Sequence, residues 1–393
     1  MRKRSRVTHL PEVRVPEDNR PLVAPIYQSV KFTFDDVEET LRQWNGQREG
    51  YYYSRVSNPT LRQLEIALAD LQDRDACLLT ASGVAAIALP LLGLLEAGQH
   101  VVYFAELYPP TRSLVRRLLG RYGVRSTMLT LSDPDSLERT LATVPTRLVL
   151  LESPSNPVLR VVDLERVTAA ARRHGALTML DNTLGGLHNH GRYDVDLYVH
   201  SLTKYASGHG DVMGGAVIGR RELVDALRDD AINLGATLDP HAAWLVLRGL
   251  KTYFLRWEAQ CANALRVAQF LAGRTEVERV RYPGLPADPG HELATRQMDG
   301  YGTIVTFDLR DGTDAATRFA EALELFAITS SLGSTESLVV PPALQQPRGL
   351  DASQAAWTGI GPGTVRLSIG IEDADDLVSD LGQALARSAA NDA

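Results

Sequence analysis

The sequence predicts an α/β fold, with a mostly parallel, seven-stranded sheet followed by a smaller C-terminal α+β domain. Between residues 76 and 219, short apolar runs alternate with helical patterns, which is typical of a parallel sheet covered by helices on both faces. After Pro283 the alternation stops, and the elements follow the order of an α+β unit. The length of 393 residues, 44% of them hydrophobic, is enough for two or three folding units with a sizeable core.

The chain begins with about 55 residues that show little periodicity. Four prolines between residues 11 and 25 favour extended chain, and residues 14–31 are expected to form an arm that lies on another surface. A short helix is expected at 35–44. A second helix is expected from Thr60, a suitable N-cap residue, because leucines at positions 61, 64, 68 and 71 share one helical face.

Apolar periodicity then predicts the remaining elements in order. The strands of the large sheet are expected at 76–79, 100–104, 125–129, 147–152, 177–181, 197–200 and 216–218. Helices are expected between them, at 83–96, 111–120, 134–143, 164–174 and 221–229, and a long helical pattern at 241–271 is expected to bridge two domains. The C-terminal region predicts strands at 303–309, 327–331 and 364–369, helices at 315–325 and 374–387, and a long loop at 334–362.

The composition argues against several function classes. A formal net charge of -7 argues against general nucleic-acid binding. The uncharged run at 78–95 has the length of a membrane span, but Ser82, Gly83, Pro90 and Gly93 within it favour a buried strand, turn and helix. The two cysteines form no disulfide framework and the N-terminus carries no secretory signal, so a cytoplasmic location is expected.

The segment 200–211 contains the pattern that indicates chemistry. Lys204 follows a predicted strand, and the hydroxyl residues Ser201 and Thr203 beside it point to the same side if the chain is extended. Two hydroxyls suit a bound phosphate ester, and a lysine amine suits imine formation with an aldehyde. Together they suggest pyridoxal 5′-phosphate (PLP) as the cofactor. The alternative interpretation is a surface lysine in a loop rich in Ser and Thr.

Four further residues fit an aldehyde that carries a phosphate. Gly83 opens a helix, where free backbone N–H groups form an anion site. Asp181 ends a predicted strand and could keep a pyridine nitrogen protonated, and Tyr108 could stack on a ring. Asn156 lies on the turn after another strand. Each also has a simple structural explanation, such as a helix cap or a turn, but all four follow the carboxyl ends of predicted strands, as Lys204 does.

These residues lie within motifs that resemble the Cys/Met-metabolism family of PLP enzymes, which includes cystathionine γ-synthases, cystathionine lyases and methionine γ-lyases. The resemblance covers nearly the whole chain. The matching motifs include Tyr53-Ser54-Arg55, Asn58-Pro59-Thr60, Ser82-Gly83, Glu152-Ser153-Pro154, Asn156-Pro157, Asp181-Asn182-Thr183, Ser201-Leu202-Thr203-Lys204, Gly208-His209-Gly210-Asp211, Arg248-Gly249-Leu250, Ser331-Leu332-Gly333 and Arg366-Leu367-Ser368.

The resemblance implies the aspartate-aminotransferase-like fold, known as fold type I, and a role for each matching residue. Lys204 would bind PLP covalently and act as the catalytic base, Asp181 would pair with the ring nitrogen, and Tyr108 would stack on the ring and assist the leaving group. Asn156 would lie beside the ring hydroxyl. The phosphate would be held by Gly83, Val84, Ser201 and Thr203, and the substrate carboxylate by Arg366 with help from Ser331.

The resemblance also implies a homo-oligomer, expected to be a dimer of dimers. Residues 1–55 would form an arm that contributes to the neighbouring subunit's site, where Tyr53 and Arg55 would reach the phosphate. Residues 56–248 would form the large PLP-binding domain, and residues 249–393 the C-terminal domain with the substrate-binding arginine. No metal, nucleic acid or membrane partner is expected.

The chain departs from the family pattern at several positions near the expected site. Pro109 and Pro110 stand where Gly-Gly is usual, and Arg112-Ser113 replaces Asn-Arg. Ser330 stands where enzymes acting on cystathionine often carry a glutamate, which argues against a substrate with a distal ammonium group. His188 and His190 are two residues apart; a solvated loop is expected rather than a metal pair, because no third ligand is evident.

The implied activity is γ- or β-elimination on an amino acid, expected to contain sulfur, with release of a 2-oxo acid and ammonia. One alternative is γ-replacement on an O-acylhomoserine. Another is elimination of a non-sulfur group, such as a halide, in a specialised pathway. A protein that keeps the fold without catalysis is a further alternative, and the presence of Lys204, Asp181 and Arg366 argues against it.

Overall fold

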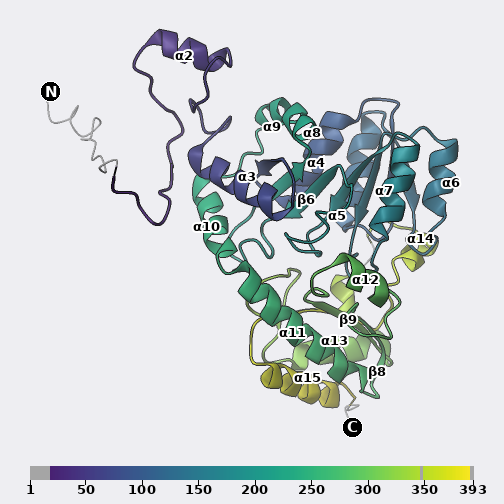
Figure 1. Cartoon of the computed structure of the whole chain (residues 1–393). Helices are drawn as coiled ribbons and strands as arrows, with labels where there is room; N and C mark the ends of the chain where they lie inside the picture. The colour runs from purple at the N-terminus through teal and green to yellow at the C-terminus, as the bar shows by residue number, and fades with distance from the viewer. Residues whose placement is uncertain (1–17, 346–347, 390–393) are drawn as a thin grey trace.

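The computed structural model describes residues 18–345 and 348–389 and contains two sheets, each with its own hydrophobic core (Figure 1). The large sheet has seven strands in the order β1-β7-β6-β5-β4-β2-β3. All pairings among strands β2 to β6 are parallel. Strand β7 is antiparallel to both of its neighbours, β1 and β6. The prediction of a mostly parallel, seven-stranded sheet is therefore confirmed. The strands are β1 (Ala76–Thr80), β2 (His100–Phe104), β3 (Arg125–Leu129), β4 (Leu148–Glu152), β5 (Leu177–Asp181), β6 (Leu197–Ser201) and β7 (Gly215–Gly219).

Apolar strands in the middle of this sheet are buried on both faces because helices cover them. Strand β3, at the sheet edge, remains partly exposed. The helices of this domain are α3 (Pro59–Leu71), α4 (Gly83–Leu94), α5 (Pro109–Ser113), the π-helical turn η1 (Leu114–Leu119), α6 (Ser136–Thr143), α7 (Leu164–Arg173), α8 (Arg221–Ala226) and α9 (Arg228–Leu234).

Helix α3 begins two residues earlier than expected. Its N-cap is Asn58, whose side chain accepts the Thr60 N–H at 2.9 Å, and Pro59 occupies the first helical position. Proline suits this position because its missing N–H would have no partner there. The expectation that Thr60 caps the helix is wrong; its hydroxyl instead accepts the Tyr27 N–H at 3.0 Å and fixes the arm to the body.

The helical pattern at 241–271 is two helices rather than one, α10 (Pro240–Leu250) and α11 (Tyr253–Ala272). The break lies against the loop that follows Lys204. Arg256 from α11 donates to the Gly249 carbonyl at 2.9 Å and to the Tyr205 carbonyl at 3.1 Å. Side-chain periodicity does not report this break, because the apolar face continues through both helices.

The smaller domain contains a five-stranded sheet in the order β10-β11-β12-β9-β8. Its core includes Phe307 and Phe319, which pack edge to face against each other. The long loop expected at 334–362 is partly wrong, because it contains a strand that pairs with β12. The elements are β8 (Val277–Arg281), α12 (His291–Gln297), β9 (Ile304–Leu309), α13 (Gly312–Ala322), β10 (Ala327–Ile328), β11 (Leu338–Val340), η2 (Pro342–Leu344), α14 (Ala352–Trp357), β12 (Thr364–Ser368) and α15 (Ala374–Ala389).

The segment 18–55 is bonded to the body near its ends, through Ala24, Tyr27 and Arg55. Its middle stands away from the rest of the molecule and carries helix α2 (Val37–Trp44) at its far end (Figure 1). No residue of α2 is buried, and its Val37 and Trp44 side chains are 75% and 65% exposed. An isolated antiparallel β-bridge between Lys31 and Tyr53 closes the segment into a loop. Over the described part of the chain, the structure has no helix with the length and apolarity needed to cross a membrane.

Candidate active site

A cavity of about 270 Å³ lies at the carboxyl ends of β4, β5 and β6, beside the first turn of α4. Ligands of parallel α/β sheets bind at this edge. Nine of the residues expected at the site line the cavity, which are Gly83, Val84, Tyr108, Asn156, Asp181, Ser201, Thr203, Lys204 and Arg366. Glu152 on β4 pairs with Asp181 on β5, which pairs with Val199 on β6. This pairing explains how residues distant in sequence meet here.

Lys204 lies in the turn after β6, with its backbone held by hydrogen bonds to Ser201 and Gly208. Its Nζ donates to the Ser331 hydroxyl at 2.9 Å. Ser331 does not itself line the cavity and is connected to the site by this hydrogen bond. Burial, and then the nearby positive charge of Arg366, lower the pKa of Lys204. A lowered pKa favours the neutral amine, which is the form that acts as a nucleophile or a base.

Thr203 belongs to the same turn, so the chain is not extended between Ser201 and Thr203. Strand β6 ends at Ser201, and the Thr203 hydroxyl accepts the Gly214 N–H at 3.1 Å. Both hydroxyl residues still line the cavity. The turn, rather than an extended chain, therefore presents both residues to the cavity.

Asp181 ends β5 and is buried. Its Oδ1 accepts the Thr183 N–H at 3.1 Å, and the Thr183 hydroxyl in turn accepts the Ser201 N–H at 2.9 Å. Burial raises the pKa of Asp181, and the hydrogen bonds from Thr183 oppose that rise. A cationic partner in the cavity would stabilise this buried carboxylate. Thr183 thus ties Asp181 to the strand that carries Ser201.

The first turn of α4 forms the opposite wall. Ser82 caps the helix, with its hydroxyl accepting the Ala85 N–H at 3.2 Å. Gly83 packs so closely on β6 that an added Cβ would lie 2.7 Å from the Ser201 Cβ. The first N–H groups of a helix have no partner within the helix, so this turn is suited to an anion such as a phosphate.

Arg366 enters the cavity from β12 of the smaller domain and is buried. Its Nη1 donates to the Asn156 Oδ1 at 2.8 Å, and its Nη2 donates to the Ser331 carbonyl at 2.7 Å. Burial lowers the pKa of Arg366 to about 10. This guanidinium has the planar geometry that binds a carboxylate through two hydrogen bonds.

Glu152 is a site residue to which the sequence analysis gave no role. It ends β4, is buried, and accepts the Tyr108 N–H at 3.1 Å and the Asn156 N–H at 2.8 Å. Burial and the neighbouring Asp181 raise its pKa well above its usual range. Its position at a strand end, like that of Asp181, is the sequence signal that could have identified it.

Tyr53 and Arg55 lie outside the cavity of their own chain. Arg55 donates to the Ile232 carbonyl at 3.1 Å, and its guanidinium carbon lies 5.4 Å from the centroid of the Tyr53 ring. A single chain therefore does not bring these two residues together with Lys204.

The segment with His188 and His190 is not a solvated loop, and that expectation is wrong. His190 is buried and pairs with the Asn182 Oδ1 at 2.7 Å, and His188 pairs with the Tyr253 hydroxyl at 2.8 Å. Burial lowers the pKa of His190 to about 3. Among the described residues, no group of three or more His, Cys, Asp or Glu side chains could hold a metal ion.

A larger cavity, of about 700 Å³, lies between α7 and the segment 279–293. Two of its charged groups, Arg281 and Asp288, already have partners. Arg281 binds Asp308 through two hydrogen bonds, of 2.9 and 2.6 Å, and Asp288 accepts two backbone N–H groups. The smaller cavity, which contains a lysine and two buried carboxyl groups, is therefore the better candidate for catalysis.

Comparisons with known proteins agree with this site. Residues 10–386 match the family model described as Cys/Met metabolism PLP-dependent enzyme. L-methionine gamma-lyase of Pseudomonas putida is 42% identical over 372 residues, which cover 94% of this chain and 93% of that protein.

Two solved structures have the same fold. Cystathionine gamma synthase from Xanthomonas oryzae pv. oryzae, in complex with aminoacrylate and cysteine, is 39% identical and matches with a TM-score of 0.88 over 93% of each chain. A putative O-acetylhomoserine (thiol)-lyase from Campylobacter jejuni, described with N'-pyridoxyl-lysine-5'-monophosphate, is 31% identical, also with a TM-score of 0.88, over 93% of this chain and 96% of that one. These matches confirm fold type I and PLP as the cofactor. The chain belongs to the family of PLP-dependent enzymes of cysteine and methionine metabolism.

Proposed function

We propose that this enzyme catalyses γ-elimination on an amino acid with an uncharged, sulfur-containing side chain, releasing a thiol, a 2-oxo acid and ammonia. The observation that carries this proposal is the chemistry of the cavity wall. Among the described residues that line it, the carboxyl groups are those of Glu152 and Asp181. Both already accept backbone N–H groups. A distal ammonium group, as in cystathionine, would find no free carboxylate there.

The remaining wall suits a short apolar side chain. Serine stands at position 330, and Ile87, Leu184, Met213 and Leu332 contribute apolar surface. A thioether loses little on transfer to such a surface, whereas an unpaired ammonium group pays a large desolvation cost. The similarity to a methionine gamma-lyase over nearly the whole chain supports the same assignment.

Each residue has a proposed task in this reaction. PLP, when bound, supplies a ring that takes up the electron pair released as the Cα–H bond breaks. Lys204 Nζ accepts the α-proton, and the Asp181 carboxylate keeps the ring nitrogen protonated. Loss of a Cβ proton then supplies the electron pair that breaks the Cγ–S bond, and water hydrolyses the remaining fragment to the 2-oxo acid and ammonia. Arg366 holds the substrate carboxylate as a bidentate partner, with Asn156 and Ser331 fixing its guanidinium.

The other proposed tasks concern the leaving group and the phosphate. The Tyr108 hydroxyl donates the proton that the departing sulfur needs. Gly83, Val84, Ser201 and Thr203 hold the phosphate at the start of α4. All four line the cavity; Gly83 and Val84 belong to the first turn of α4, and Ser201 packs against Gly83.

A substrate panel tests the proposal. The purified enzyme should release a 2-oxo acid from methionine without any added nucleophile, and much more slowly from cystathionine. γ-Replacement is the second candidate, supported by the similarity to a cystathionine gamma synthase. Turnover of an O-acylhomoserine that requires an added thiol, with no 2-oxo acid from methionine, would favour replacement and exclude the proposal.

We also propose that the active enzyme is a homo-oligomer, a dimer of dimers, in which Tyr53 and Arg55 of one subunit reach the phosphate in its neighbour. Two observations support this. The part of the segment that carries α2 stands off its own chain with apolar side chains exposed (Figure 1), and Arg55 lies outside the cavity of its own chain. Apolar surface of this extent is typical of an interface.

Arg55→Ala should weaken PLP retention by about tenfold or more, because a charge-assisted hydrogen bond to the phosphate is lost. Spectral titration of the apo-enzyme with PLP measures this change. Arg48→Ala is a matched control, since Arg48 lies in the same segment and pairs with Glu39 of its own chain. Equal PLP affinity in Arg55→Ala and wild type would contradict the shared site.

A further inference from the structure

Glu152 lies where three segments of the large domain meet, namely the end of β4, the start of α5 and the turn that carries Asn156. One oxygen, Oε2, accepts the Tyr108 N–H at 3.1 Å, and the other, Oε1, accepts the Asn156 N–H at 2.8 Å. We propose that Glu152 is a positioning residue, whose two carboxylate oxygens fix the backbone of the two residues that flank the cofactor ring. This inference rests on the proposed function.

The position of Tyr108 depends on its backbone hydrogen bond to Glu152 more than that of a residue with a buried side chain would. Its side chain is 41% exposed, so surrounding residues do not fix the ring by packing. The chain then enters α5 through Pro109 and Pro110, which have no N–H to offer a second donor. The bond from the Tyr108 N–H to Glu152 therefore ties the start of this turn to the end of β4, while Arg112 of α5 ties it to the Ala105 and Leu107 carbonyls after β2.

Asn156 links Glu152 to Arg366, the residue proposed to bind the substrate. Its backbone is held by Glu152, and its side-chain Oδ1 accepts from Arg366 Nη1 at 2.8 Å. Arg366 belongs to the smaller domain, so this chain of contacts joins β4 to β12. A shift of the Asn156 turn would move the guanidinium that is proposed to hold the substrate carboxylate.

A glutamate side chain at this position serves both amides, one with each oxygen. The two N–H groups lie on different segments, and a glutamate offers a separate oxygen to each. Glutamine would keep one acceptor and turn its NH₂ group toward the other N–H, leaving a buried donor unsatisfied. Aspartate would keep both oxygens but withdraw them by one methylene group.

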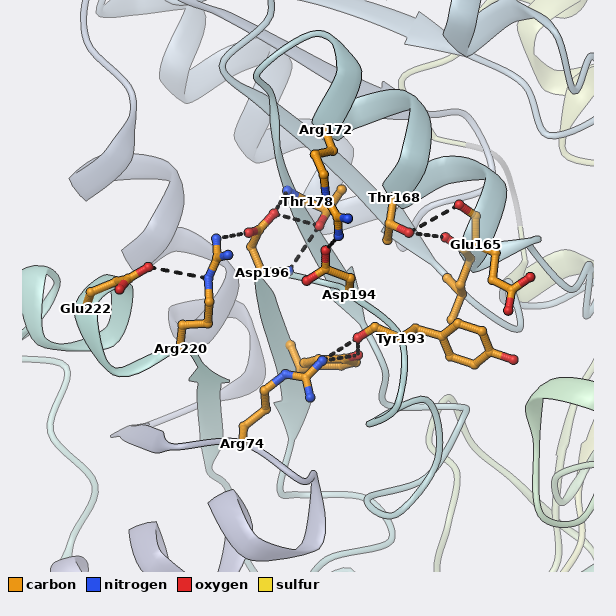
Figure 2. A network of polar contacts seen from close by, with 12 residues as sticks. Arg74, Glu165, Thr168, Arg172, Thr178, Tyr193, Asp194, Asp196, Arg220 and Glu222 are labelled. Atoms are coloured by element: carbon orange, nitrogen blue, oxygen red, sulfur yellow. Dashed lines mark hydrogen bonds and ion pairs between the residues drawn. The ribbon is translucent and has the colours of Figure 1, made fainter.

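Asp196 provides a matched control at the far end of the same sheet. It precedes β6 and accepts the Thr178 N–H at 2.7 Å and the Thr178 hydroxyl at 2.9 Å, while Arg220 pairs with its other oxygen (Figure 2). Like Glu152, it bridges neighbouring segments through both oxygens. It differs in lying at the amino end of β6, away from Lys204.

The test compares Glu152→Gln with Asp196→Asn. Glu152→Gln should lower kcat/KM by about 100-fold, since displacement of site groups by about 1 Å has effects of this size. Both kcat and KM should change, because Tyr108 and Arg366 serve different steps. The visible circular dichroism of bound PLP should also change, as its ring neighbours move. Asp196→Asn should lower Tm without changing either property, and Glu152→Asp should lie between wild type and Glu152→Gln.

A second measurement does not depend on a variant that folds. In the wild-type enzyme, site-resolved hydrogen exchange should show slow exchange of the Tyr108 and Asn156 amides. Fast exchange of both, or a Glu152→Gln enzyme with wild-type circular dichroism and kcat/KM, would overturn the inference. A wild-type protein that fails to bind PLP would instead overturn the proposed function, so the two failures are distinguishable.

Discussion

Lys204→Ala should abolish turnover, with kcat reduced by about 1000-fold or more, because the variant loses both its nucleophilic amine and its proposed base. Burial and Arg366 lower the pKa of Lys204, so the neutral amine forms more readily than on an exposed lysine. Release of the 2-oxo acid measures turnover. Borohydride reduction of the PLP-loaded wild type, followed by peptide mass analysis, should label Lys204.

The labelling experiment can identify the reactive residue clearly because the chain has only four lysines, at positions 3, 31, 204 and 251. Lys31 and Lys251 are exposed, and of the three lysines in the described residues only Lys204 lines the cavity. Lys251→Ala is the matched control and should keep wild-type rates and labelling. A Lys204→Ala enzyme that retains one tenth of the activity, or a label on another lysine, would contradict the assignment.

Asp181→Asn should have opposite effects on activity and on the stability of the apo-enzyme. Turnover should fall by about 100-fold, because the buried carboxylate no longer holds the ring nitrogen protonated. Burial raises the pKa of Asp181, so its charge opposes folding when no cation is bound. Native Asp181 binds its proton more tightly than the unfolded chain does, so its contribution to stability is lost as pH rises through the raised pKa. Asparagine carries no such charge.

Thermal unfolding of apo- and PLP-loaded enzyme tests this prediction. Near neutral pH, apo Asp181→Asn should unfold at or above the wild-type Tm, while its gain in Tm on adding PLP should be smaller. The substitution keeps an acceptor for the Thr183 N–H, so a general loss of structure is not expected. Near-normal turnover together with an unchanged PLP-dependent gain in Tm would mean that another group holds the ring nitrogen.

Most of the proposed cofactor site could be predicted from sequence because its residues lie at the starts of helices or directly after strands. Gly83 opens a helix, and Asp181 and Lys204 follow apolar strands, so periodicity alone locates them. Parallel pairing then places the carboxyl ends of β4, β5 and β6 at one edge. The departure at Ser330 was also visible in sequence, and the cavity confirms only that this residue lines the wall.

The contacts that hold these residues in place could not be predicted in the same way. Glu152 accepts a backbone N–H 44 residues away and Thr183 accepts one 18 residues away, and no local pattern predicts which N–H group a side chain will accept. The N-cap of α3 was misplaced because Asn58 and Thr60 are both good capping residues, and Pro59 decides between them. The break between α10 and α11 follows from packing of Arg256 against Gly249 and Tyr205.

The sequence by itself determined the fold class, the family and the chemistry-bearing side chains, since these depend on periodicity and on residue types at fixed spacing. Tertiary structure decided how those side chains are oriented and shared. It joined Lys204 to Ser331, Arg366 to Asn156, and the backbone N–H groups of Tyr108 and Asn156 to the buried Glu152. The reason is physical, because a hydrogen bond forms between groups that packing brings within about 3 Å, whatever their separation along the chain.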